Sequence, residues 1–149
     1  MKKVLIVEDE ILARLGLRQL VDWRKLELEL LPDATDGEEA LEMIRNSCPD
    51  IILLDLNIPK VSGLEILEFL KKEEMPTKVI VVSCQEEFDV VKKAMKLGAY
   101  DYLRKLNLSS DELENILEKC LVETEERITV HNAGKYVRSY EEIVRDSRD

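Results

Sequence analysis

The stretch Ile51-Ile52-Leu53-Leu54-Asp55 places a carboxylate directly after four consecutive apolar residues. An unbroken apolar run of this length is typical of a strand that is buried on both faces of a parallel sheet. Similar runs occur before and after it in the chain, the weakest of them just before Pro32: Val4–Val7, Leu28–Leu31, Val79–Val82 and Tyr100–Leu103. We therefore predict five strands in a parallel sheet.

The segments between these runs have the periodicity of amphipathic helices. The clearest apolar stripe has the spacing i, i+3, i+4, i+7 and i+8, and two shorter stripes precede it. In chain order the stripes are Ala40, Leu41, Ile44 and Cys48; Phe88, Val91 and Met95; and Leu113, Ile116, Leu117, Cys120 and Leu121. Strands that alternate with helices predict an α/β fold, a doubly wound parallel sheet with right-handed crossovers and helices on both faces.

Boundary signals support this helical register. Ser62 with Glu65, and Ser109 with Glu112, have the spacing of a capping box, in which a hydroxyl and a carboxylate satisfy free backbone N–H groups at a helix start. Gly98 is suited to the end of a helix, because glycine tolerates the left-handed conformation that helix ends often require. These signals predict where three of the helices begin or end.

Residues 122–149 differ in character from residues 1–121. The segment Glu123–Arg127 is strongly charged, and His131-Asn132-Ala133-Gly134 is expected to break a helix. Lys135–Arg145 is predicted to form one further short helix, which would be marginal alone. We therefore expect a single domain over residues 1–121, followed by a helical, charged linker or docking extension over residues 122–149.

Composition excludes several classes of function. The chain has 149 residues, of which 45% are hydrophobic and 36% are charged, and no apolar run approaches the roughly 20 residues that span a bilayer. The apolar start is too short for a signal peptide, so we expect a cytoplasmic protein without a membrane partner. The net charge of −10 argues against direct binding of a nucleic-acid backbone by this chain.

The cysteine and histidine content does not suit a zinc site. The three cysteines, Cys48, Cys84 and Cys120, lie far apart without a CxxC pair, and His131 is the single histidine. A structural zinc site needs four such ligands at close spacing. We therefore interpret the cysteines as reduced thiols.

Polar residues follow the apolar runs where the runs end. Glu8 and Asp9 follow the first run, Asp55 and Ser83 follow two others, and Lys105 follows the last. The carboxyl ends of parallel strands meet at one edge of a sheet, where such folds bind ligands. Carboxylates that crowd together repel unless a cation lies between them, and Mg²⁺ is the natural cation for oxygen ligands and phosphates. A single acidic residue at a strand end could simply be solvated, but the whole set favours a site.

This set of residues is suited to phosphoryl transfer. A carboxylate beside a metal can act as a nucleophile toward phosphorus and form an aspartyl phosphate. Lys105 can neutralise a phosphoryl oxygen as a point charge, and Ser83 can donate a hydrogen bond to another. Positioning and charge stabilisation dominate such a transfer.

Over residues 1 to about 121, the sequence resembles the receiver domain of bacterial two-component response regulators. The motifs that carry the resemblance are Val4–Glu10, Asp50–Pro59, Gly63, Val81–Ser83 and Gly98–Lys105. The resemblance implies a flavodoxin-like fold with strand order 2-1-3-4-5. It also implies that Asp55 is the phosphoacceptor and that a sensor histidine kinase is the partner.

The resemblance assigns a role to each further residue of the set. Asp9 and Asp55 would bind Mg²⁺ directly with the backbone carbonyl of Asn57, and Glu8 would act mostly through water. Ser83 and Lys105 would hold the phosphoryl oxygens. Tyr102 would be the aromatic switch residue, whose ring responds to movement of Ser83. Asn57 and Gln85 would tune the rate at which the phosphoryl group is hydrolysed.

Two positions depart from the family pattern. Receivers usually have proline after the lysine, often with a cis bond, whereas Lys105 precedes Leu106. A cis bond before a non-proline residue costs about 3–4 kcal/mol, so we predict a trans bond and a local loop that differs from the one usual in receivers. Cys84 stands where a smaller residue is common and is expected to narrow access to the phosphoryl pocket.

The resemblance also suggests how a signal would leave the domain. We expect the change at Asp55 to pass through Ser83 and Tyr102 to the face formed by the last two helices and the last strand, which would bind a second copy, a partner or an output domain. The segments Val21-Asp22-Trp23 and Glu87-Phe88 resemble receivers of AraC-type transcriptional regulators, so we expect a C-terminal helix-turn-helix output beyond residue 149.

Two alternatives remain. A stand-alone receiver would act as an interaction module, and the length of the full gene would distinguish it from a regulator. A haloacid-dehalogenase-like phosphatase also uses an aspartate nucleophile with Mg²⁺, but it carries a second aspartate two residues later, where this chain has Asn57.

Overall fold

The computed structural model describes residues 1–84 and 87–134. Strands and helices alternate along the described chain. The strands are β1 (Lys2–Val7), β2 (Leu28–Leu30), β3 (Ile51–Leu54), β4 (Lys78–Ser83) and β5 (Asp101–Arg104). The helices are α1 (Ile11–Leu20), α2 (Gly37–Ser47), α3 (Gly63–Lys72), α4 (Phe88–Lys96) and α5 (Ser110–Gly134).

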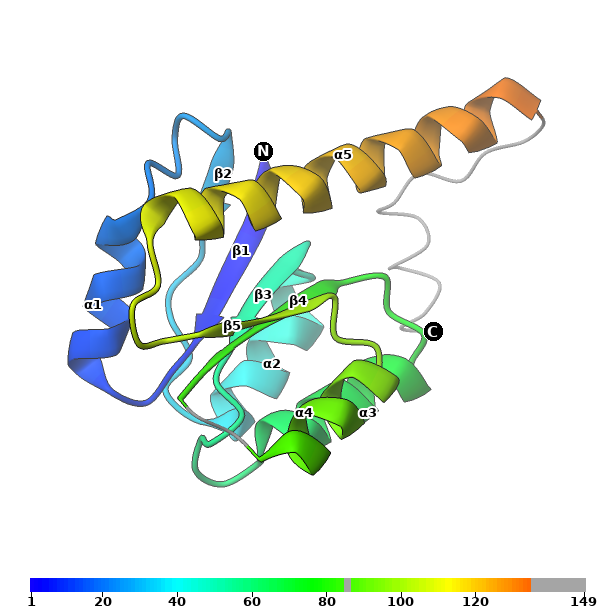
Figure 1. Ribbon diagram of the computed structural model, residues 1–149. Helices are drawn as coiled ribbons and strands as arrows, with labels where there is room; N and C mark the ends of the chain where they lie inside the picture. Colours follow the sequence, from blue (N-terminus) through cyan, green and yellow to red (C-terminus); the bar gives the residue numbers. More distant parts are fainter. Residues whose placement is uncertain (85–86, 135–149) are drawn as a thin grey trace.

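The strands form one parallel sheet in the order β2-β1-β3-β4-β5, so the predicted fold class and strand order are confirmed. Helices α1 and α5 cover one face of the sheet, and α2, α3 and α4 cover the other (Figure 1). In register, Val7 of β1 lies beside Leu54 of β3. The carboxyl ends of these two central strands therefore lie side by side at one edge.

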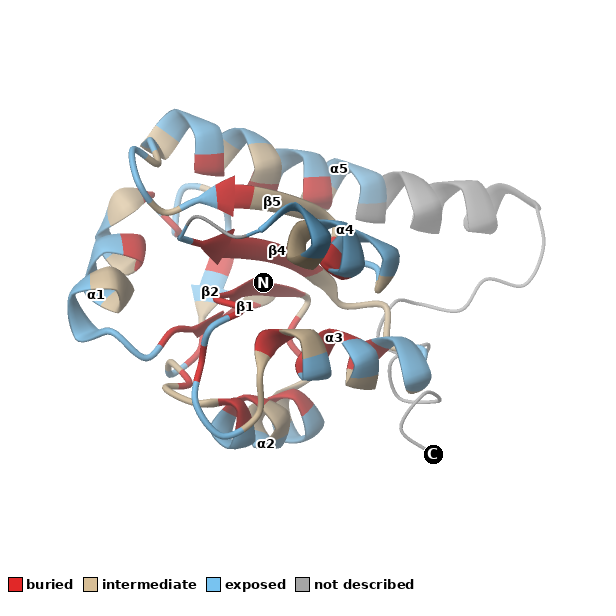
Figure 2. Cartoon of the chain, turned by 60° about the horizontal axis from the view of Figure 1, so that its bottom comes forward, coloured by how far each residue is buried: buried red, intermediate tan, exposed pale blue. Residues whose placement is uncertain are grey.

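Strands β1, β3, β4 and β5 contribute side chains to two cores, one on either face of the sheet, whereas the short edge strand β2 contributes only to the core under α1 and α5. Leu5 and Ile52 pack in the core under α2, α3 and α4, whereas Ile6 and Leu53 pack under α1 and α5. All four are at most 1% exposed, and Figure 2 shows that burial is concentrated in the strands. Burial on both faces explains why the central strands β1, β3 and β4 contain unbroken apolar runs.

The predicted apolar face of α4 is wrong. Phe88 and Met95 are 78% and 43% exposed, and the buried residue of the helix is Ala94. Val90 and Leu97 pack against the core beside Ala94. The helix carries two adjacent apolar stripes, and helical periodicity alone does not determine which of them the sheet covers.

Helix boundaries follow the predicted capping signals. The Ser62 hydroxyl accepts from the Glu65 N–H at 3.2 Å, and the Glu65 carboxylate accepts from the Ser62 N–H at 2.7 Å, which completes the capping box of α3. At the start of α5, the Ser109 hydroxyl accepts from the Glu112 N–H at 3.1 Å. These hydrogen bonds satisfy N–H groups that have no partner within the helix.

The expected break at His131-Asn132-Ala133-Gly134 is also wrong, because α5 continues to Gly134. The charged segment that precedes these residues consists largely of glutamate and arginine, which are good helix formers. The short helix predicted over Lys135–Arg145 lies outside the described residues. Within the part of the chain that the structure describes, no helix has both the length and the apolar character that crossing a membrane requires.

The loop between β3 and α3 is packed tightly against the start of α2. The Gly37 N–H donates to the Pro59 carbonyl at 3.1 Å, and a Cβ added to Gly37 would lie 1.9 Å from the carbonyl oxygen of Val61. Gly16 of α1, by contrast, has no heavy atom within 4 Å of an added Cβ. Only glycine therefore fits at position 37, next to the loop that follows Asp55.

These two glycines make a matched pair for a stability test. We expect Gly37→Ala to lower the free energy of unfolding by about 1–3 kcal/mol, because the new methyl group overpacks against backbone. Gly16→Ala should raise it by about 0.5–1 kcal/mol, because alanine is the better helix former. Urea denaturation of both variants measures the difference, and a Gly37→Ala protein as stable as the native chain would contradict this packing.

Candidate functional site

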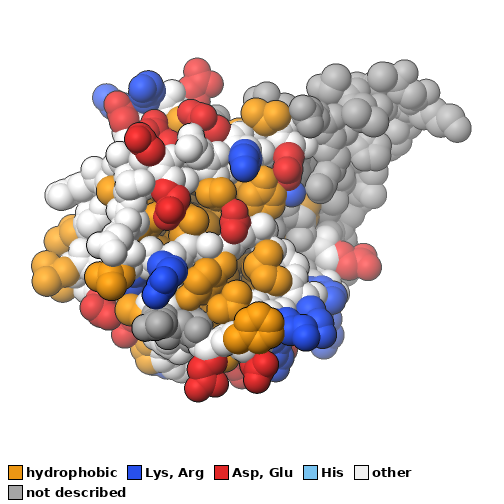
Figure 3. Space-filling view, in the orientation of Figure 1, with side chains coloured by type: hydrophobic (Ala, Val, Ile, Leu, Met, Phe, Trp, Pro, Cys, Tyr) orange, Lys and Arg blue, Asp and Glu red, His pale blue; other side chains and the backbone are white. Residues whose placement is uncertain are grey.

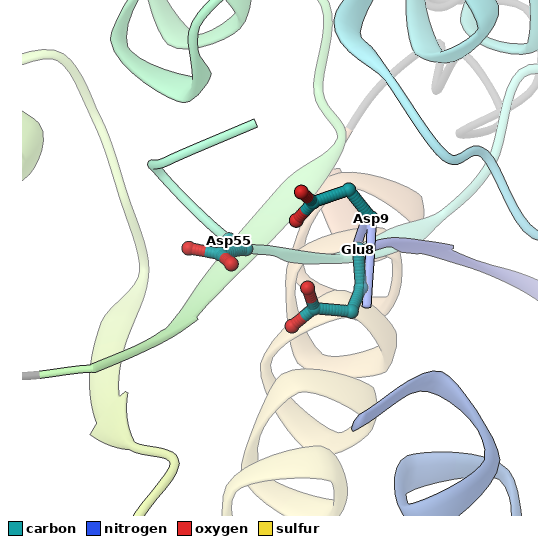
Figure 4. A group of neighbouring side chains, drawn as sticks. All are labelled: Glu8, Asp9 and Asp55. Carbon is teal, nitrogen blue, oxygen red and sulfur yellow. The ribbon is translucent and has the colours of Figure 1, made fainter. Parts of the chain in front are cut away.

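The structure brings the polar residues that follow the strands to one edge of the sheet. Glu8 and Asp9 follow β1, Asp55 follows β3, Ser83 ends β4, and Lys105 follows β5. Figure 4 shows the carboxylates of Glu8, Asp9 and Asp55 turned toward one shared space. One carboxylate oxygen from each of the three lies within 4.8 Å of the others.

This cluster is unusual because much of it is buried. Among the described residues, the buried polar side chains are Glu8, Asp55 and Ser83, which are 1%, 5% and 0% exposed. Asp9 is exposed beside them. Burying ionised groups is unfavourable unless they are paired or bind a cation, so this arrangement requires compensation.

Both oxygens of Asp55 have hydrogen-bond partners. Its Oδ1 accepts from the Asn57 N–H at 3.0 Å and from the Ser83 hydroxyl at 3.1 Å, and its Oδ2 accepts from the Lys105 ammonium at 2.8 Å. Gly63 packs closely against the backbone at Asp55 and Leu56, because an added Cβ would lie 2.6 Å from the Cα of Leu56 and 3.0 Å from the Asp55 carbonyl oxygen. Donors from three different segments thus fix the orientation of Asp55.

Lys105 is the cation that the buried carboxylates share. Its ammonium forms ion pairs with Glu8 and with Asp55. Burial opposes the charge on Lys105, but its hydrogen bonds to Asp55 and Glu8 outweigh burial and raise its pKa above the ordinary value. The lysine is therefore positively charged at neutral pH.

Lys105 reaches the carboxylates although it is followed by leucine, where the receivers that the sequence resembles usually have proline. No peptide bond among the described residues is cis, so the prediction of a trans bond between Lys105 and Leu106 is confirmed. The Leu106 side chain is 76% exposed and points away from the core. The Lys105 N–H donates to the Ser83 carbonyl at 2.9 Å, which continues the pairing of β5 with β4 and places the lysine at the site.

Glu8 is the carboxylate whose ionisation the site disfavours most clearly. Burial raises the pKa of Glu8, hydrogen bonds from Lys105 and from the Glu10 N–H lower it, and the charge of Asp55 raises it again, so that the net shift is upward. The Glu10 N–H donates to Glu8 Oε2 at 3.0 Å. A cation close to Glu8 would therefore compete with a proton.

The donor set of this cluster fits Mg²⁺. Magnesium prefers carboxylate, carbonyl and water oxygens, and here Glu8, Asp9 and Asp55 offer carboxylate oxygens at one point. Asn57 lies two residues after Asp55, and its N–H donates to Asp55 Oδ1 at 3.0 Å, so its backbone lies beside this carboxylate. The arrangement leaves solvent access on the side of Asp9.

The Tyr102 side chain contacts the loop after β4, next to Ser83. Its hydroxyl donates to the Cys84 carbonyl at 2.8 Å, and its half-buried ring packs against the core under α2, α3 and α4. Cys84 itself is exposed. Gln85, to which the sequence analysis assigned a tuning role, lies outside the described residues.

Sequence reasoning missed Arg14, which lies in the first turns of α1. Its guanidinium donates to the carbonyl oxygens of Glu8 at 3.1 Å and of Asp9 at 3.0 Å. The only signal in the sequence is an arginine that follows two acidic residues at a distance that one turn of helix can bridge. That spacing is too common to single out a functional residue.

Comparison with known proteins places this site in a family. The model of the response regulator receiver domain matches residues 4–118. An "Uncharacterized response regulatory protein" of Staphylococcus epidermidis is 33% identical over 118 residues, which are 79% of this chain and 46% of that protein. The "Nitrate/nitrite response regulator protein NarL" of Escherichia coli is 33% identical over 102 residues, which are 68% of this chain and 47% of that protein.

Solved structures give the same result. The receiver domain of AraT, a response regulator from Geobacillus stearothermophilus, superposes with a TM-score of 0.77 at 30% identity and covers 85% of this chain and 97% of that one. The N-terminal domain of an uncharacterised protein from Wolinella succinogenes superposes with a TM-score of 0.75 at 31% identity, covering 85% and 99% of the two chains. The chain spans about half the length of the curated relatives that it matches.

Proposed function

The chain belongs to the response regulator receiver domain family of two-component systems, and on this premise we propose that Asp55 accepts a phosphoryl group from a sensor histidine kinase. The observation that carries the proposal is the environment of Asp55, which accepts hydrogen bonds from Ser83, Asn57 and Lys105 beside the carboxylates of Glu8 and Asp9. Such an environment holds one carboxylate in place and offers donors for the phosphoryl oxygens.

In the proposed reaction, a carboxylate oxygen of Asp55 attacks the phosphorus atom of the donor. A P–O bond to Asp55 forms, the bond from phosphorus to the donor breaks, and the donor leaves with the electron pair. The Lys105 ammonium passes from Asp55 Oδ2 to a phosphoryl oxygen, and the Ser83 hydroxyl donates to another. Glu8, Asp9, Asp55 and the Asn57 carbonyl would hold Mg²⁺, which when bound supplies positive charge to the phosphoryl group.

The chain consumes its own carboxylate in this step, so we propose a phosphoacceptor that takes part in its own phosphorylation and dephosphorylation and is not a turnover enzyme. Asn57 and Gln85 are the proposed tuning residues for hydrolysis. One relative, a "Protein-glutamate methylesterase/protein-glutamine glutaminase" of Pyrococcus horikoshii, is 37% identical, but the match covers only 28% of that protein. We place the exchange with the kinase in the cytoplasm.

The test of this proposal is chemical. The native chain, incubated with Mg²⁺ and acetyl phosphate, is expected to gain the mass of one phosphoryl group in an intact-mass spectrum. Removal of the metal with EDTA should prevent the gain, because the carboxylate cluster would then repel the anionic donor. A native chain that gains no phosphoryl group under these conditions would refute the proposed function.

We propose that phosphorylation is transmitted from Ser83 to Tyr102 and then to a face formed by α4, β5 and α5. The Tyr102 hydroxyl donates a hydrogen bond to the Cys84 carbonyl, next to Ser83. A movement of this loop toward a phosphoryl group would therefore change the position of the Tyr102 side chain. The exposed Phe88 and Met95 of α4 supply apolar surface there. Figure 3 shows hydrophobic side chains among charged ones on the molecular surface. A second copy of the chain is the proposed partner, bound through this face.

Phe88→Ser is expected to weaken phosphorylation-dependent dimerisation roughly 10-fold or more, because each copy would lose a large apolar contact. Leu12→Ser is the matched control, since Leu12 is 80% exposed and lies on α1, which is not part of the face formed by α4, β5 and α5. Sedimentation velocity with and without Mg²⁺ and acetyl phosphate measures the dimer. Equal loss in both variants, or in neither, would contradict this assignment of the face.

The proposed output is control of transcription. Relatives of this chain include the "Transcriptional regulatory protein DegU" of Brevibacillus brevis, 35% identical over 103 residues that make up 43% of that protein. We propose that residues 1–121 form the receiver and that residues 122–149 lead to a DNA-binding module, for which the sequence favours an AraC-type helix-turn-helix. The continuation of α5 beyond residue 121 supports a rigid connection.

A further inference from the structure

Two of the three clustered carboxylates lie on the loop between β1 and α1, and Arg14 holds the backbone of that loop. A single guanidinium nitrogen of Arg14 donates to the carbonyls of Glu8 and Asp9, at 3.1 and 3.0 Å. The Arg14 side chain is only 17% exposed. The helix that carries it begins at the same loop, because the Arg14 N–H donates to the Glu10 carbonyl at 3.0 Å.

The surroundings of Arg14 keep its guanidinium in place. Asp33, in the loop after β2, lies 3.9 Å from Arg14 Nε, and Arg18 pairs with the same carboxylate at 2.7 Å. On the other side of the loop, the Glu8 N–H donates to the Ala34 carbonyl at 3.0 Å. Residues 8 and 9 are thus held from two sides by partners that do not belong to the carboxylate cluster.

We infer that Arg14 is a positioning residue for divalent-cation binding, which it favours by fixing the peptide groups of Glu8 and Asp9 so that their carboxylates converge. The inference rests on the proposed function, in which this cluster takes Mg²⁺. Magnesium demands near-ideal octahedral geometry, so small rotations of the loop that carries its ligands weaken binding. Partners that orient metal ligands typically change affinity 10- to 100-fold when they are removed.

The sign of the effect separates positioning from simple electrostatics. A guanidinium beside a cation site repels the cation, so on charge alone removal of Arg14 would tighten Mg²⁺ binding. If Arg14 acts by holding the two carbonyls, its removal weakens Mg²⁺ binding in spite of the lost repulsion. Lysine in its place keeps the charge, but its nitrogen ends one bond short of the terminal guanidinium nitrogen that donates to both carbonyls, and it has no Nε to face Asp33. It should therefore hold the two carbonyls less well.

The experiment measures cation binding without any phosphodonor. Mg²⁺ binding by calorimetry, and Mn²⁺ binding by the EPR signal of the free ion, are compared in the native chain, Arg14→Met, Arg14→Lys and Arg18→Met. We expect about 10-fold weaker binding for Arg14→Met and a smaller weakening for Arg14→Lys. Arg18→Met is the matched control, because Arg18 shares Asp33 with Arg14 but donates its own hydrogen bonds to Leu31 and Asp33, away from Glu8 and Asp9. The Arg18→Met protein should bind the cations as tightly as the native chain does.

A second readout uses the phosphorylation reaction. Arg14→Met should need about 10-fold more Mg²⁺ for half-maximal phosphorylation by acetyl phosphate, and its rate at saturating Mg²⁺ should stay close to the native rate. A general structural defect would lower the saturated rate as well. Thermal unfolding of each variant reports whether it is folded, and Arg14→Lys carries the test if Arg14→Met does not fold.

Three outcomes overturn the inference: equal or tighter cation binding in both Arg14 variants, the same weakening in Arg18→Met, and no cation binding by the native chain. A native chain that binds Mg²⁺, loses it in Arg14→Met and yet forms no phosphoryl adduct supports the inference and refutes the proposed function. The two claims can therefore fail separately.

Discussion

Asp55→Asn is expected to eliminate the phosphoryl adduct that Mg²⁺ and acetyl phosphate produce on the native chain. The amide oxygen of asparagine is far less nucleophilic than a carboxylate, so the rate should fall by at least about 100-fold, equivalent to about 2.7 kcal/mol in the barrier. Asparagine has nearly the same shape, and its amide oxygen can still accept from the Asn57 N–H and the Ser83 hydroxyl. Lys105 loses one acceptor but keeps its ion pair with Glu8, so the variant should fold. Glu8 and Asp9 remain in place, so an acyl phosphate that still formed at the native rate would show that one of them is the acceptor.

Asp50→Asn is the matched control for this substitution. Asp50 directly precedes β3, at the opposite end of the strand from Asp55, and its carboxylate accepts from the Lys3 N–H at 2.8 Å. The control should form the adduct at the native rate. Intact mass spectrometry follows both variants, and treatment with hydroxylamine, which cleaves acyl phosphates, distinguishes an aspartyl phosphate from a phosphate ester on Ser83. An undiminished, hydroxylamine-sensitive adduct in Asp55→Asn would rule out Asp55 as the acceptor.

The central strands could be predicted from the sequence because they are buried on both faces. Ile51-Ile52-Leu53-Leu54 has no polar residue to interrupt it, and β3 occupies this same stretch. Helical stripes are less decisive, because a helix on the surface can carry apolar residues on two sides. In α4, the small Ala94 allows close approach to the sheet, while the larger Phe88 remains in solvent. Side-chain size and packing determine which face of α4 is buried against the sheet, and the helical periodicity of the sequence does not reveal it.

The candidate site could be located from the sequence because strand ends converge in a parallel sheet. Asp55 and Lys105 are far apart in the chain, yet their side chains lie 2.8 Å apart because β3 and β5 both end at this edge. The hydrogen bonds that support the site could not be predicted in the same way. Arg14 contacts backbone carbonyls, which every residue possesses, so its role depends on the path of a loop and leaves no pattern of residue types.

Lys105→Met is expected to destabilise the folded chain strongly at neutral pH. The Lys105 side chain is 16% exposed and pairs with Glu8 and Asp55, whose side chains are 1% and 6% exposed. Removing one partner of a buried ion pair typically lowers the free energy of unfolding by about 3–5 kcal/mol, because the other charge is left without compensation. Lys93→Met is the control: its ion pair with Glu68 is exposed, and its loss should change stability little.

The loss of stability in Lys105→Met should be smaller at low pH than at high pH. Burial already raises the pKa of Glu8 above 4.5, and Lys105 opposes that shift, so removal of the lysine raises the Glu8 pKa further. A carboxyl group with a raised pKa binds its proton more tightly in the folded state. Its contribution to stability is therefore fully present below pH 4.5 and is lost as the pH rises through the folded pKa. Urea denaturation should show a smaller deficit at pH 5 than at pH 8.

Two further variants separate charge from packing in this prediction. Millimolar Mg²⁺ should restore much of the stability of Lys105→Met at pH 8, since the ion replaces the lysine among the carboxylates and stabilises only the folded state. Glu8→Gln in the Lys105→Met background should also recover stability, because it removes the buried charge that has lost its partner. If acid, Mg²⁺ and Glu8→Gln all fail to reduce the deficit, the lysine stabilises the fold through its aliphatic stem, and the carboxylates do not need it as a counter-ion.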